Sequence, residues 1–90
     1  MTPLEKIILD YKKWSRPWEF YGHIINNEKL TQEDIERFKK IWVEAGDFKL
    51  WNHSELKIGA NSASEYIREN YRLSEEAIHN IVNALAYDWK

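Results

Sequence analysis

Histidines are the first residues to test for chemistry, because imidazole is the commonest metal ligand in proteins. His23, His53 and His79 have no second histidine at ligand spacing, and the chain contains no cysteine. His53 and Glu55 are two residues apart, so they do not share one face of a helix. The sequence therefore predicts no metal site and no cofactor, and the lack of cysteine excludes thiolate zinc sites and cysteine nucleophiles.

Motifs for nucleophilic and acid–base catalysis are missing as well. Most serines stand where helix N-caps are expected, and none lies in a GxSxG turn. These capping serines are Ser54, Ser62, Ser64 and Ser74. Paired carboxylates such as Glu75 and Glu76 fall in first helical turns, where they complement free backbone N–H groups. Three isolated glycines cannot form a phosphate-binding loop. We expect that the protein is not an enzyme.

A helix-turn-helix motif for DNA binding is the main alternative function. Residues 52–72 resemble such a motif in outline when Gly59 is placed at the glycine of the turn. Only Ile58 and Ala60 then match the pattern of buried positions. In this alternative, the second helix would contact DNA with a set of four side chains: Ser62, Ser64, Arg68 and Arg72. A net charge of −2 gives little of the counterion release that drives binding to phosphate backbones.

The segment from Lys12 to Tyr21 is the most distinctive one in the chain. Four aromatic and three cationic residues fall within ten positions, around a bend fixed by Pro17. Trp18 and Tyr21 share a helix face, whereas Phe20 points elsewhere, so not all rings can face inward. Trp, Tyr and Arg dominate binding hot spots. The predicted contacts with a partner are Trp14, Arg16, Trp18 and Phe20. The alternative is that these rings form the core, with Arg16 stacked over Trp18.

Composition indicates one small domain over residues 1–90, because domains usually contain about 100–150 residues. A thin core without disulfides has to rely on aromatic area, and the chain has five Trp, five Tyr and three Phe. Apolar runs such as Ile7–Leu9 are far too short for a membrane span, and no signal-peptide pattern begins the chain. We therefore expect a cytoplasmic protein that does not enter a membrane.

Capping signals and apolar spacing predict an all-α fold, a compact bundle of five or six short helices. Thr2, Thr31 and Ser74 are expected N-caps of helices that begin at Pro3, after Thr31 and after Ser74. The first should run to about Trp14, and the helix after Thr31 should end at a left-handed cap on Gly46. Another helix is expected over residues 17–25.

Residues 47–59 are the least determined part of the predicted bundle. Asn52 and Glu55 favour a short helix that ends at Gly59, and a minor irregular segment or hairpin is the alternative. Ser62 and Glu65 then predict a new helix that ends near Asn70 or Tyr71.

The sequence as a whole favours a protein-binding module that docks onto a larger protein as a regulator, inhibitor or immunity-type factor. Catalytic motifs are missing, the charge is balanced, and there are more aromatic residues than one apolar stripe per helix requires. The surplus rings would contact another protein or a second copy of the chain.

Overall fold

The computed structural model describes residues 2–89 and is all-helical over that range. Six α-helices and one 3₁₀ helix make up this part of the chain, so the predicted bundle of short helices is confirmed. Their bounds are α1 Pro3–Asp10, η1 Pro17–Glu19, α2 Phe20–Ile25, α3 Gln32–Ala45, α4 Phe48–Trp51, α5 Leu56–Asn70 and α6 Glu75–Asp88. No strand occurs between residues 2 and 89, so the hairpin considered for residues 47–59 is not formed.

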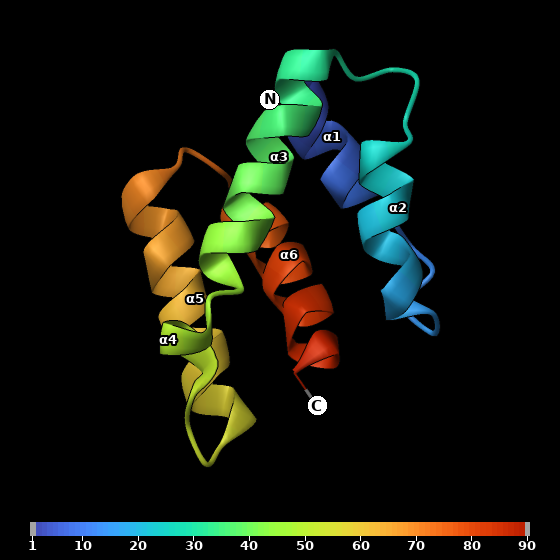
Figure 1. Cartoon of the computed structure of the whole chain (residues 1–90). Helices are drawn as coiled ribbons and strands as arrows, with labels where there is room; N and C mark the ends of the chain where they lie inside the picture. The colour runs from blue at the N-terminus through green and yellow to red at the C-terminus, as the bar shows by residue number, and fades with distance from the viewer. Residues whose placement is uncertain (1, 90) are drawn as a thin grey trace.

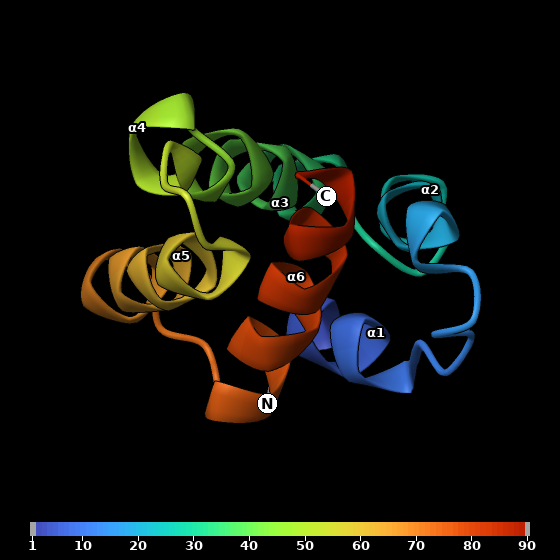
Figure 2. The ribbon, with the colours of Figure 1, turned by 90° about the horizontal axis from the view of Figure 1, so that it is seen from below.

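Helix α6 lies at the centre of the bundle and contacts α1, η1, α3 and α5. Viewed from below, α5 lies on one side of it and α1 and α2 lie on the other (Figure 2). The apolar residues of α6 recur at helical spacing and are buried, among them Ile78, Ile81 and Leu85. Asn80 of α6 donates a hydrogen bond to the carbonyl of Ile8, 3.1 Å away, which ties α1 to α6. A single buried cluster receives side chains from all six α-helices.

Three of the predicted N-caps, at Thr2, Thr31 and Ser74, are confirmed, whereas Asn52 and Ser62 do not begin helices. Thr2 and Ser74 accept hydrogen bonds from the backbone N–H groups of Glu5 and Ala77. Thr31 forms a complete capping box with Asp34, in which each side chain accepts a hydrogen bond from the other residue's backbone N–H. These caps were predictable because each depends only on residues within one helical turn.

Helix α1 ends four residues earlier than predicted. Tyr11 takes an extended conformation, and its buried ring sends the hydroxyl to the carbonyls of Lys13 and Arg16, at 3.1 and 2.6 Å. Pro17 already keeps Arg16 out of the helical region. The turn before Pro17 therefore gains two hydrogen bonds from Tyr11, and Trp14 lies in that turn instead of in α1.

The predictions for residues 46–62 are mostly wrong. Gly46 caps α3 with a φ of −92°, so it is not left-handed; its small size matters instead, because an added Cβ would lie 2.9 Å from the Trp42 carbonyl oxygen. Asn52 ends α4 instead of starting a helix. Helix α5 runs unbroken through Gly59 and Ser62, so neither residue marks a helix end. Figure 1 shows α5 as one continuous helix beside α4.

Gly59 is tolerated inside α5 because Trp51 lies against it. A Cβ at Gly59 would fall 2.6 Å from Cε3 of Trp51, which is too close for any side chain there. The Trp51 indole N–H donates to the carbonyl of Ala45 at 2.7 Å, so the ring is held in place. A glycine within a helix usually costs about 1 kcal/mol relative to alanine. Packing of the Trp51 ring against the bare backbone offsets this cost.

Candidate functional site

Four large apolar side chains remain exposed around the C-terminal end of α6. They come from η1, α4, the first turn of α5 and the residue after α6, and we call them the end surface: Trp18, Phe48, Leu56 and Trp89. Figure 2 views the molecule from this side, with the start of α5, the end of α6 and η1 toward the reader. Elsewhere in residues 2–89, the exposed large apolar residues are Val43 and Ile58.

The last turn of α6 brings the separate parts of the end surface together. Tyr87 packs against Trp18, with ring centroids 5.6 Å apart. Trp89 packs against Phe48 at 6.2 Å and stacks on Trp51 at 6.3 Å, with the two indole planes only 2° apart. Residues distant in sequence therefore form one surface because α6 ends among them.

An open hollow of about 310 Å³ lies within the end surface. It is lined by side chains from the turn before η1, from η1 itself, from the start of α5 and from α6: Trp14, Pro17, Leu56, Asn83, Ala86 and Tyr87. Tyr87 is shared between this hollow and the Trp18 contact. The lining mixes apolar rings with the amide of Asn83, as binding pockets usually do.

Three of the four predicted contact residues lie at or beside this surface. Trp18 is 54% exposed, and Trp14 is half-buried against Tyr11 while it also lines the hollow. Arg16 is exposed, and its Nε lies 3.3 Å from a carboxylate oxygen of Glu19. The alternative in which these rings form the core is confirmed for Phe20, whereas Trp18 packs on Tyr87 at the surface and Arg16 pairs with Glu19.

Phe20 is not a surface residue, so its prediction as a contact is wrong. It has no exposed area, and its ring packs against Tyr11, Trp14, Phe38 and Trp42. Phe20 begins α2 directly after η1, and because it is two residues from Trp18 its ring points inward while Trp18 stays outside. Phe20 supports the end surface from below through its stacking with Trp14, at a centroid distance of 5.4 Å.

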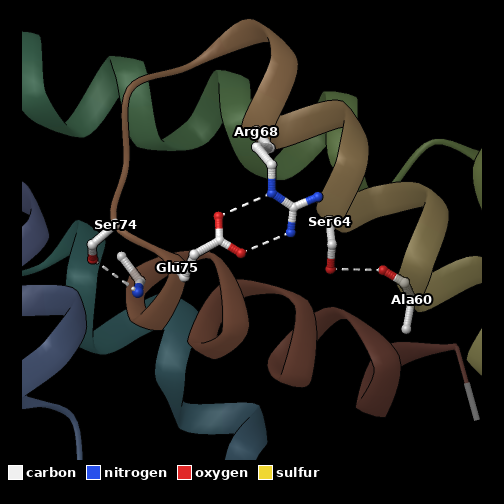
Figure 3. Close-up of polar contacts among 6 residues, drawn as sticks. Ala60, Ser64, Arg68, Ser74 and Glu75 are labelled. Carbon is white, nitrogen blue, oxygen red and sulfur yellow. Dashed lines mark hydrogen bonds and ion pairs between the residues drawn. The ribbon is translucent and has the colours of Figure 1, made fainter.

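The residues of the alternative DNA-binding site do not form a helix-turn-helix reading surface at residues 52–72. The turn expected at Gly59 is replaced by continuous helix, so Ser62 and Ser64 lie inside α5 instead of at its start. Ser64 donates to the Ala60 carbonyl at 2.9 Å (Figure 3). Arg68 makes two hydrogen bonds to Glu75, at 2.9 and 2.8 Å, and Arg72 is exposed in the connection to α6.

Titratable residues form one further cluster, between α3 and α5. The hydroxyls of Tyr66 and Tyr71 both donate to Oε1 of Glu44, each at 2.7 Å. These two hydrogen bonds hold the pKa of the Glu44 carboxyl below its ordinary value. Burial and the bond to Glu44 raise the pKa of Tyr71 to about 12, and the hydrogen bond to Glu44 also raises the pKa of Tyr66. The cluster joins α3 to the end of α5.

The pH dependence of stability should follow from this cluster. A lowered pKa of Glu44 in the folded state means that stability is lost as pH falls below about 4.5, where the unfolded chain takes up the proton first. The raised pKa of Tyr71 means that its contribution is complete below pH 10.0 and is lost as pH rises toward about 12. Thermal melts of Tyr71→Phe should show a shallower decline above pH 10.0 than the parent protein. An unchanged decline would show that Tyr71 does not contribute to the loss of stability at high pH.

Metal-binding and membrane-spanning features are not found in the described chain. Within residues 2–89, no three His, Cys, Asp or Glu side chains gather where a metal ion could be held. None of the helices in that range is long and apolar enough to cross a membrane.

Sequence reasoning missed Leu56 and Tyr87 as parts of the site. Leu56 and Ile58 are two residues apart on a helix, and that spacing prevents both from facing one core. The spacing therefore indicates that at least one of these two side chains is exposed. The predicted helix end at Gly59 led to this indication being missed. No local signal marks Tyr87, whose role depends on η1 lying next to the end of α6.

Protein-family models, curated proteins and solved structures were all compared with the chain, and none matches it. What the end surface does must therefore be inferred from its own residues.

Proposed function

We propose that this protein is a small cytoplasmic protein-binding module that docks its end surface onto a larger protein and acts as a regulator or inhibitor. The observation that carries the proposal is the gathering of Trp18, Phe48, Leu56 and Trp89 at one end of the bundle, all still exposed. Exposed apolar patches of this kind mark interaction sites on soluble proteins.

Trp18 is the proposed anchor of the interface. More than half of the residue is exposed to a partner, and the packing of its ring on Tyr87 holds the ring in one orientation before binding. A preorganised ring loses little conformational entropy when it is buried, which favours affinity. Arg16 and Trp14 flank the anchor, Arg16 at the charged rim and Trp14 in the wall of the hollow. The partner surface should be apolar at its centre, because the end surface places aromatic and aliphatic groups there.

Two observations weigh against DNA as the partner. Arg68 is engaged by Glu75 within the protein, so its charge is largely compensated. The balanced net charge of −2 offers no basic surface for phosphate contacts. A protein partner also accounts for the exposed rings, which DNA binding on the α5 face would leave unexplained.

Site-directed photo-crosslinking in the source cells tests the proposal. A benzophenone amino acid placed at Trp18 should give a crosslinked adduct with another protein, identified by mass spectrometry. The matched control replaces Val43, which is 69% exposed on α3 and does not line the hollow. The same adduct from position 43 would indicate non-specific contact, and adducts with nucleic acid alone from position 18 would contradict a protein partner.

A further inference from the structure

The end surface places a projecting ring directly beside a hollow. Trp18 projects from η1, and its neighbour Pro17 lines the hollow of about 310 Å³. Tyr87 contacts the Trp18 ring and also forms part of the hollow's lining. The Trp18 ring and the hollow therefore lie next to each other on the end surface.

A ring next to a hollow on one patch gives the two halves of a contact that a twofold axis would pair. In a twofold interface, the same patch is used by both subunits, and residue i of one chain contacts residue j of the other in both directions. A twofold axis close to the boundary between Trp18 and the hollow would insert each Trp18 ring into the hollow of the other copy. We propose that a second copy of this chain covers the end surface when no larger partner is bound.

The exposed apolar area is sufficient for the centre of such a dimer. Trp18, Phe48 and Trp89 are 54%, 60% and 37% exposed. With about 150–250 Å² available per ring, these three side chains present roughly 300 Å². A standard interface buries about 800 Å² per partner, of which somewhat more than half is apolar. The three rings therefore supply more than half of the apolar area that one copy needs, and Leu56 adds to it.

The charges around the end surface permit two identical copies to meet. Basic and acidic residues alternate next to the apolar positions in the chain, and both signs flank three of them. Arg16 and Glu19 flank Trp18, Asp47 and Lys49 flank Phe48, and Glu55 and Lys57 flank Leu56. A rim of a single sign would repel its own copy, whereas a mixed rim can pair with itself.

The inference rests on the proposed function only in taking the end surface as the contact site. It adds a regulatory consequence, because the second copy and the larger partner would compete for Trp18. Dissociation of the dimer would then precede binding of the partner.

Sedimentation velocity of the purified protein tests the inference without any partner. Over concentrations from about 1 µM to about 1 mM, the mass should change from that of one chain to that of two. Trp18→Glu should raise the dimer dissociation constant at least about 30-fold, as expected for removal of a hot spot. Val43→Glu, at an exposed apolar position outside the hollow, should leave the dissociation constant unchanged. Circular dichroism checks that each variant keeps its helices.

Reciprocal charges test the twofold geometry itself. Leu56→Arg changes the hollow, where the partner copy's indole would sit, and should also weaken the dimer. In an equimolar mixture of Trp18→Glu and Leu56→Arg, one of the two contacts becomes a Glu–Arg pair and the other stays native. The mixture should therefore form more dimer than either variant alone.

A monomer at every concentration would overturn the inference, as would a dimer that Trp18→Glu does not weaken. Either result would leave the proposed function standing, because crosslinking to a different protein is measured separately. Conversely, a dimer without any crosslinked partner would support the inference and contradict the proposed function.

Discussion

Phe20→Ala is expected to lower the free energy of unfolding by about 3–5 kcal/mol, because it removes a fully buried aromatic ring and leaves a cavity. For 90 residues, the total stability should be about 5–13 kcal/mol, so much of it would be lost. The loss is large because Phe20 contacts aromatic rings from several elements, including Tyr11, Phe38 and Trp42. Urea denaturation followed by circular dichroism measures the change.

Phe48→Ala is the matched control for this prediction. It removes the same ring from a position that is 60% exposed, so the change in unfolding free energy should stay below about 1 kcal/mol. If the two variants lose equal stability, the placement of Phe20 in the core and of Phe48 on the end surface is wrong. The comparison thus tests whether Phe20 is a core residue and not a contact residue.

Trp51 and Gly59 should behave as one coupled unit. Trp51→Ala is expected to cost about 3–5 kcal/mol, because the ring is 5% exposed and its N–H bond to Ala45 is lost. Gly59→Ala should cost about 1–3 kcal/mol from overpacking, since its Cβ would lie 2.6 Å from the Trp51 ring. This cost is reduced by a gain in helix propensity of up to about 1 kcal/mol.

The double variant separates these two effects. In the Trp51→Ala background, the clash is gone, so Gly59→Ala should become neutral or stabilising by up to about 1 kcal/mol. Gly22→Ala is the control, because the nearest atom to its added Cβ is a side-chain nitrogen of Asn26 at 3.7 Å. Additive effects of Trp51→Ala and Gly59→Ala in denaturation experiments would show that the two residues do not pack together in solution.

The elements that sequence predicts well are those defined within one turn. Thr31 and Ser74 are caps because their own neighbours satisfy them, and no distant contact is needed. Gly59 shows the opposite case. Its intrinsic preference favours a helix end, but Trp51, eight residues away, packs on it and keeps α5 continuous. The predicted helix start at Ser62 failed for the same reason.

The candidate site was predictable in part from the crowding of aromatic residues between Lys12 and Tyr21. One helix face cannot hold all of these rings, so exposure of some ring followed from geometry alone. Which ring stays outside depended on tertiary contacts, because Phe20 packs against Tyr11, Phe38 and Trp42 whereas Trp18 lies on Tyr87 at the surface. Local spacing does not reveal that Trp89 and Phe48 join the same surface, because their contact depends on where α6 ends.

The central claim is that Trp18 is exposed for binding and is not needed for folding. The most direct measurement uses the purified partner identified by crosslinking, titrated calorimetrically with the parent protein and with Trp18→Ala. Affinity should fall at least about 30-fold, while the unfolding free energy falls by less than about 2 kcal/mol and the variant stays folded at 25 °C. Unchanged affinity, or a loss of stability as large as that of Phe20→Ala, would contradict the claim.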